Sequence, residues 1–197
     1  MSAPARLHFT DAPAAQELIA RDPLALLVGF CLDQQITVQQ AFLGPLRLLE
    51  RLGHLDAARI AATDPAVLEA VFRTKPAIHR FPGAMARRVQ ELCAVIAEEY
   101  DGATARIWTE AVDADDLQRR LGALPGFGEM KVRTMTVVLA RRLGVRAPGI
   151  DAVLPDHRTL GDVDSDEALV AYQTTKRAKK AAARRAGAQQ AGATAKR

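Results

Sequence analysis

The stretch Leu124-Pro125-Gly126-Phe127-Gly128 stands between two segments of helical character and determines how they connect. Two glycines two positions apart let the backbone turn tightly, because neither carries a Cβ atom. The residues before it, 115–121, predict a short helix, and a second helix is predicted from Glu129 to about Leu143. The first N–H groups of that second helix have no partners within it. With the turn amides, they can form a concave site for a phosphate oxygen.

A helix, a Gly-Phe-Gly turn and a helix have the layout of the helix-hairpin-helix DNA-binding motif. The stretch L-P-G-F-G resembles the L-P-G-[VI]-G form of that motif. An ordinary connection between two helices that contains two glycines is the alternative, since Gly-rich turns are common.

Composition favours a single helical domain. The chain has 197 residues, of which 49% are hydrophobic and only 5% aromatic. A core built mostly from Leu, Val, Ala and Ile suits helices better than sheets, so we expect an all-α protein. No apolar run reaches the roughly 18 residues of a membrane helix, and the start lacks the pattern of a secretory signal. We therefore expect a soluble, cytoplasmic protein with no membrane partner.

Cofactor and metal sites are not expected. The two cysteines, Cys31 and Cys93, lie far apart in apolar helical patterns and predict buried, reduced thiols. An iron–sulfur cluster needs about four thiolates, and no Cys/His group has zinc spacing.

Charge is unevenly distributed. The whole chain carries +4 and residues 168–197 carry +8 with no acid, so residues 1–167 carry −4. Nucleic-acid binding by the body would therefore depend on local patches and backbone amides. We expect a last helix from Val163 to about Arg185, a folded body over 1–172, and over 173–197 a basic, Ala-rich segment that is the helix end and a tail. The tail is either disordered or a nucleic-acid arm.

Polar residues follow a fully apolar helix near the N-terminus. Asp22-Pro23 predicts a helix start, residues 24–32 are apolar all round, and Asp33-Gln34-Gln35 come next. The polar group can be a helix end facing water. Alternatively, Gln34 or Gln35 lies at the mouth of a cleft and enters a DNA stack from which a base has been removed. Thr37 is expected to cap the next helix.

Three arginines lie near the start of a long helix predicted over 84–100. Arg80, Arg87 and Arg88 oppose the helix dipole there, which invites a phosphate partner. We expect Arg87 and Arg88 to face outward, and an ordinary solvated face is the alternative for each.

Several stretches in order resemble the helix-hairpin-helix base-excision DNA glycosylases, the endonuclease III superfamily, and a small bacterial branch of it without the cluster. The likeness spans about residues 23–155. Leu26 to Gln35 is similar to the L-L-x-x-x-L-S-x-Q segment, and the hairpin matches. The segment from His79 to Cys93 and Gly149-Ile150-Asp151 are similar to the basic helix and to the V-D stretch that brings the catalytic aspartate.

The resemblance implies a bilobal all-α body that binds double-stranded DNA with a damaged base and acts as a monomer at the nucleoid. Gln35 would fill the gap in the stack, and the amides of Gly126, Phe127 and Gly128 would hold a phosphate. Asp151 would stabilise the positive charge that develops on the sugar as the glycosidic bond breaks. A helix N-cap is the alternative role for Asp151, and Asp33 is the second carboxylate candidate, as an acid or base.

Strand cleavage is not expected. Family members that cleave carry a lysine two residues after the second hairpin glycine, where this chain has Met130. Lys131 is one residue later, which rotates its side chain by about 100°. We therefore expect hydrolysis alone, with Lys131 as a DNA contact and Schiff-base chemistry at Lys131 as the alternative. Glu129 departs from the basic or neutral residue that the family has beside the phosphate.

The resulting prediction is a DNA glycosylase of base excision repair. A non-catalytic helix-hairpin-helix DNA-binding protein is the second hypothesis, and a helical protein-interaction domain with a basic tail is the third.

Overall fold

The computed structural model describes residues 4–176 and 178. Within them the chain is helical and forms no strand, so the all-α prediction is confirmed. The helices are α1 (Pro13–Arg21), α2 (Pro23–Leu32), α3 (Val38–Leu52), α4 (Ala57–Ala61), α5 (Pro65–Arg73), α6 (Pro82–Tyr100), α7 (Arg106–Thr109), α8 (Ala114–Gly122), α9 (Glu129–Arg141), α10 (Ile150–Val153) and the 3-10 helix η1 (Leu160–Asp162).

Helix α2 lies at the centre, as its apolar sequence predicts. Every residue from Leu24 to Leu32 is buried. The carboxylate of Asp22 accepts hydrogen bonds from the N–H groups of Leu24 (2.9 Å) and Ala25 (3.1 Å), and Pro23 occupies the first turn. The helix is therefore capped by side-chain chemistry and held by packing on all sides.

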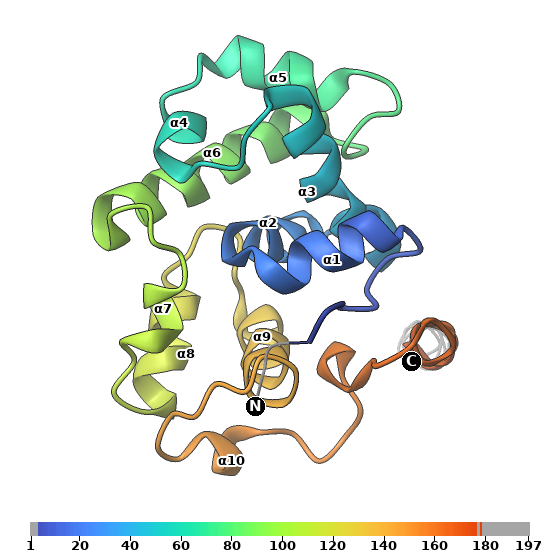
Figure 1. The fold of residues 1–197 in the computed structure, drawn as a ribbon, viewed down its shortest axis with the longest axis vertical. Helices are drawn as coiled ribbons and strands as arrows, with labels where there is room; N and C mark the ends of the chain where they lie inside the picture. The colour runs from blue at the N-terminus through green and yellow to red at the C-terminus, as the bar shows by residue number, and fades with distance from the viewer. Residues whose placement is uncertain (1–3, 177, 179–197) are drawn as a thin grey trace, which may run out of the picture.

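The helices form two groups with α1 and α2 between them (Figure 1). Helices α3 to α6 lie at one end and α7 to α10 at the other. Among the larger helix contacts, α1, α2 and α3 pack together, α4 and α5 pack on α6, α8 packs on α7 and α9, and η1 packs on α9. The second group meets α2 at the turn before α9, where the ring centroid of Phe127 lies 6.4 Å from that of Phe30 on α2. We call this junction the seam.

Both ends of the described chain pack on the body. Leu7 and Phe9 are fully buried, and Phe9 meets Phe42 edge to face at 5.0 Å, as expected for the N-terminal arm. A last helix over 166–176 returns to the first group, where Gln173 donates to the side-chain oxygen of Gln39. The boundary at 172/173 separates the first residues of this helix from its end, which the prediction assigned to the C-terminal segment. Residues 177 and 179–197 of the predicted tail lie outside the described residues.

Among the described residues there is no candidate for a membrane-spanning helix or a metal-binding group. None of their helices has both the length and the apolar character that crossing a bilayer requires. No group of His, Cys, Asp and Glu among them could hold a metal ion. Cys31 and Cys93 are buried free thiols, and burial raises their pKa to about 11 and about 12.

Candidate nucleic-acid interface

The predicted hairpin is a type II β-turn between α8 and α9. The N–H of Phe127 donates to the carbonyl of Leu124 at 3.1 Å, Pro125 takes the second position, and Gly126 has φ +84° at the third. A type II turn requires a positive φ at that third position, which glycine adopts without a steric cost. The helix, turn and helix order predicted from the sequence is therefore present.

Three backbone N–H groups at the start of α9 are available to form hydrogen bonds with a ligand. The carbonyl of Gly128 accepts from the N–H of Lys131 (2.9 Å) and Val132 (3.1 Å). Across residues 4–176 and 178, no acceptor is found for the N–H groups of Gly128, Glu129 and Met130. Gly128 is exposed, and a Cβ atom there would meet nothing within 4 Å. These amides form an open, electropositive helix terminus, which we call the α9 nest.

Phe127 has a different role from the one expected. Its N–H closes the turn, and its side chain is buried at the seam. The residue anchors the hairpin to α2 and has no group left for a direct DNA contact.

An ion pair reduces the effect of the negative charge of Glu129, which lies beside the α9 nest. The carboxylate of Glu129 lies 2.7 Å from the guanidinium of Arg133, one turn later on α9, and both side chains are largely exposed. An i,i+4 pair of this kind compensates part of the negative charge near the amides.

The hairpin is held against α6 by Arg88. A Cβ atom on Gly126 would lie 2.8 Å from Cδ of Arg88 and 3.5 Å from Sγ of Cys31. The absence of a side chain at Gly126 therefore lets the turn, α6 and α2 approach closely. The prediction that Arg88 faces outward is wrong, because Arg88 is partly buried and lies on the same helix face as Met85 and Leu92. That spacing in the sequence is the signal that could have identified it.

Gln34 is fixed inside the protein and is not free to enter DNA. Its amide nitrogen donates to the carbonyl of Cys31 (3.0 Å), and its amide oxygen accepts from Arg88 (2.8 Å). Its backbone carbonyl lies 2.9 Å from Nε2 of His79. Since Nδ1 of His79 accepts from the N–H of Phe81 (3.0 Å), the proton of the neutral ring lies on Nε2 and is donated to Gln34.

Gln35 is the exposed amide of the pair. Its φ is +56°, in the left-handed region, although it is not glycine. Such a conformation costs about 1–3 kcal/mol and persists only when the surroundings impose it. The hydrogen bonds of Gln34 supply that constraint, so the Gln35 side chain is presented to solvent from a fixed backbone.

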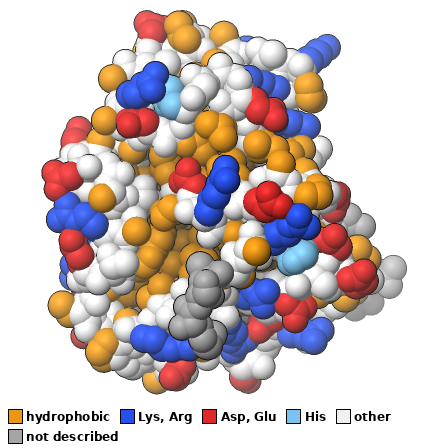
Figure 2. All heavy atoms as spheres, viewed as in Figure 1, with side chains coloured by type: hydrophobic (Ala, Val, Ile, Leu, Met, Phe, Trp, Pro, Cys, Tyr) orange, Lys and Arg blue, Asp and Glu red, His pale blue; other side chains and the backbone are white. Residues whose placement is uncertain are grey.

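Arg80 and Arg87 remain exposed, as predicted. The guanidinium of Arg80 lies 4.7 Å from the ring centroid of Phe81, which is itself exposed. Within the described chain neither arginine has an acidic partner. On the face drawn in Figure 2, Lys and Arg side chains alternate with Asp and Glu, and hydrophobic side chains gather in a central hollow. Because positive and negative side chains are mixed on this face, phosphate binding would depend on individual donors and not on an extended basic surface.

A lysine lies near a carboxylate at the end of α2. Lys131 is half-buried, and its ammonium donates to the carbonyl of Cys31 at 3.1 Å. Burial lowers its pKa, and the nearby thiol of Cys31 and carboxylate of Asp33 oppose that shift. The ammonium is thus turned toward the seam. Asp33 ends α2, and its charge also raises the pKa of Tyr172, although burial of that phenol is the main cause.

Asp151 does not join this group. It is exposed on α10, whose N-cap is Gly149, so the alternative role of Asp151 as an N-cap is wrong. The carbonyl of Pro148 accepts from the N–H of Ala114 (2.9 Å), which places α10 at the start of α8. The nine residues of α8 separate that end from the hairpin by about 13 Å. In Figure 1, α10 lies at the far end of the molecule from α2.

Comparison of the chain with protein-family models, with curated proteins and with solved structures gave no match.

Proposed function

We propose that this protein is a DNA glycosylase with a helix-hairpin-helix fold, which hydrolyses the bond between a damaged base and its sugar in duplex DNA. The observation that carries the proposal is the proximity of three features at one seam. They are the α9 nest, the constrained Gln35 and the Asp33–Lys131 pair, linked by contacts through Cys31, Gln34 and Arg88.

The α9 nest supplies sequence-independent binding to the strand. Peptide N–H groups at a helix N-terminus suit a phosphate oxygen, and phosphate contacts position a protein without reading sequence. Arg80 and Arg87 add exposed positive charge. Gln35 then fills the space that the everted nucleotide leaves in the stack, which offsets part of the few kcal/mol that eversion costs.

Asp33 supplies the chemistry. As the glycosidic bond breaks, positive charge develops on the sugar, and a carboxylate held close to it in a half-buried site stabilises that charge or takes a proton from the attacking water. Lys131 lies near enough for its positive charge to act on this carboxylate. The bond from C1′ to the base nitrogen breaks, the oxygen of water bonds to C1′, and the base leaves with the electron pair and takes up a proton from solvent. The step is therefore hydrolysis and needs no covalent enzyme intermediate.

The test is release of bases from duplex oligonucleotides that each contain one lesion, from a panel of oxidised, deaminated and alkylated bases. We expect the wild-type chain to release at least one lesion, and Asp33→Asn to reduce that rate by about 100-fold or more. Asp151→Asn, an exposed carboxylate removed in the same way, is the matched control and should retain the rate.

One outcome would overturn the proposal, and another would overturn the role of Asp33. Release of no lesion, with binding to duplex DNA retained, would favour a non-catalytic DNA-binding protein. Full activity in Asp33→Asn with loss in Asp151→Asn would move the chemistry to α10.

A further inference from the structure

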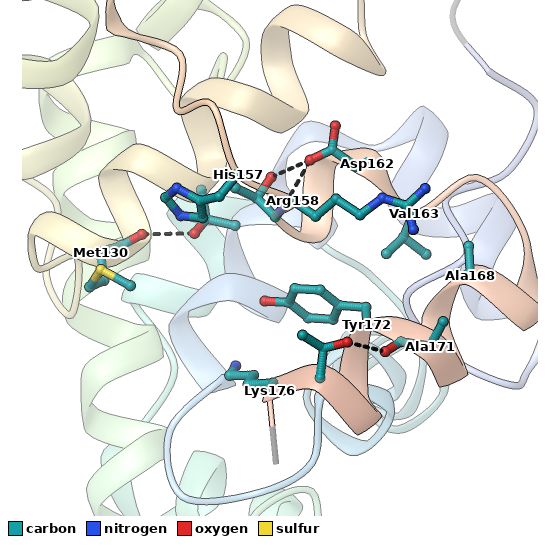
Figure 3. Close-up of a pocket in the computed structure, with 12 residues that line it drawn as sticks. Met130, His157, Arg158, Asp162, Val163, Ala168, Ala171, Tyr172 and Lys176 are labelled. Atoms are coloured by element: carbon teal, nitrogen blue, oxygen red, sulfur yellow. Dashed lines mark hydrogen bonds between the residues drawn. The ribbon is translucent and has the colours of Figure 1, made fainter. Parts of the chain in front are cut away.

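A cavity of about 370 Å³ lies between the first turns of α9, the loop over 157–163 and the last helix. Its size falls in the range of small-molecule sites. Figure 3 shows the ring of Tyr172 pointing into it, with Arg158 on one side of the ring and Lys176 on the other. The ammonium of Lys176 lies 5.8 Å from the centroid of that ring.

The cavity adjoins the seam. Met130 lines it and also contributes one of the three amides of the α9 nest. Tyr172 lines it and is close enough to Asp33 for the charge of that carboxylate to act on its hydroxyl. A nucleotide leaving a strand held at the nest would therefore find this space next to it.

The carboxylate in the cavity wall is occupied by hydrogen bonds within the protein. The carboxylate of Asp162 accepts from Arg141, from the N–H of Thr159 (2.7 Å) and from the hydroxyl of Thr159 (3.2 Å). It is the one acidic residue of the lining. Its negative charge is therefore already compensated within the protein.

The groups that remain available are donors and cations. Within residues 4–176 and 178, no hydrogen-bond partner is found for the guanidinium of Arg158 or the hydroxyl of Tyr172. Burial and the charge of Asp33 raise the pKa of Tyr172, which keeps the hydroxyl protonated as a donor at neutral pH. The cavity thus combines an aromatic face with N–H and O–H donors and positive charge.

We propose that this cavity receives the everted base and selects uncharged bases rich in carbonyl oxygens over cationic alkylated bases. The inference rests on the proposed function. The base stacks on Tyr172, as aromatic side chains bind bases elsewhere, and its exocyclic oxygens accept from Arg158 and Tyr172. A base that carries a positive charge is repelled by Arg158 and Lys176, which disfavours alkylated purines.

The test compares release rates for four lesions in one duplex context: uracil and 8-oxoguanine as carbonyl-rich bases, 7-methylguanine and 3-methyladenine as alkylated ones. Wild type, Arg158→Gln and Tyr172→Leu are measured with full-length protein. Thr174→Ala is the control, because Thr174 is exposed on the same helix and does not line the cavity. Melting temperatures establish that each variant is folded.

We expect the wild type to release a carbonyl-rich base faster than both alkylated bases. Arg158→Gln should lower the release rate of the carbonyl-rich base by about tenfold and reduce the ratio of that rate to the rates for the alkylated bases. Thr174→Ala should leave the rate and the ratio unchanged. Faster release of the alkylated bases, or a preference unaffected in both cavity variants, would overturn the inference and leave the proposed function intact. Release of none of the lesions in this and the wider panel would overturn both.

Discussion

The guanidinium of Arg88 donates a hydrogen bond across 2.8 Å to the side-chain oxygen of Gln34, which joins α6 to the loop that follows α2. The same arginine lies against Gly126, so one side chain touches both the hairpin and the segment that presents Gln35. Two parts of the proposed DNA-binding surface are thereby held in fixed positions relative to each other.

Replacement of Arg88 by glutamine should lower the free energy of unfolding by about 1–3 kcal/mol, because a hydrogen bond to a charged group is lost and the Gln34 amide is left without that donor. Arg87→Gln removes the same charge from the neighbouring, exposed position and should change stability by less than about 0.5 kcal/mol. Urea denaturation measures both. Equal effects of the two substitutions would show that the Arg88 contact is not structural.

The two hairpin glycines should respond differently to alanine. Gly126→Ala places a side chain at φ +84° and against Arg88, so we expect a loss of stability of about 1–2 kcal/mol or more. Gly128→Ala adds a methyl group into open space at φ −84° and should be nearly neutral. Thermal unfolding of both variants measures the difference, and similar losses would argue against the type II turn.

The contribution of the α9 nest to DNA binding can be measured at Glu129. Glu129→Pro removes one free N–H at the first helical position, where proline is tolerated, and Gly128 before it has an extended backbone that proline accepts. Glu129→Ala removes the same charge and keeps the N–H. We expect Glu129→Ala to bind duplex DNA more tightly than wild type, and Glu129→Pro to bind about tenfold more weakly than Glu129→Ala.

Fluorescence anisotropy with a labelled duplex at fixed salt measures these affinities. Equal binding by the proline and alanine variants would mean that the amides of the nest do not hold the strand.

His79 should make stability depend on pH in a defined direction. Burial is the main cause that lowers its pKa below the usual 6.5, and its neutral ring accepts from Phe81 and donates to Gln34. The unfolded chain therefore takes up the proton first. The stabilisation is complete above about pH 6.5 and is lost as the pH falls, by at most about 1.4 kcal/mol per pH unit.

Urea denaturation of the wild type and of His79→Gln at pH 7.5, 6.5 and 5.5 checks this expectation. The stability advantage of the wild type should shrink at the lower pH values. An advantage that grows on acidification would contradict a neutral His79.

Lys131 should not form a covalent intermediate with DNA. Its amine donates to the carbonyl of Cys31 at the seam, although burial lowers its pKa and so favours the neutral form. Borohydride reduces a Schiff base between a lysine and the opened sugar to a stable cross-link. With a released lesion as substrate we expect no cross-linked species on a denaturing gel. A cross-link that disappears in Lys131→Gln would show that the enzyme also cleaves the strand.

Local chemistry allowed much of the helical framework to be predicted. The Asp22-Pro23 start, the Thr37 cap and the end of α6 at Tyr100 lie where short-range rules place them. Caps and turns depend on neighbours within a few residues, so the sequence carries that information directly. The turn over 124–128 is of the same kind, because Pro125 and Gly126 suit the dihedral angles of a type II turn.

Which residues form the site depends on contacts between segments that are distant in the sequence. Lys131 comes near Asp33 because its ammonium donates to the carbonyl of Cys31 at the end of α2. Tyr172 reaches the same region from the last helix. The family resemblance implied that Asp151 is the catalytic carboxylate, but α8 lies between it and the hairpin. Gln34 and Gln35 are adjacent in sequence but differ in their surroundings. Gln34 is hydrogen-bonded to Arg88 and His79, whereas the side chain of Gln35 is exposed.

The sequence alone determined that the chain is helical, that α2 begins after Asp22, and that a two-glycine turn joins α8 to α9. These features follow from dihedral preferences and capping within a few residues. Only the tertiary structure decided which polar side chains share the seam and which face solvent. That choice depends on how helices far apart in the chain pack, and side-chain burial and hydrogen bonding between them have no local signal.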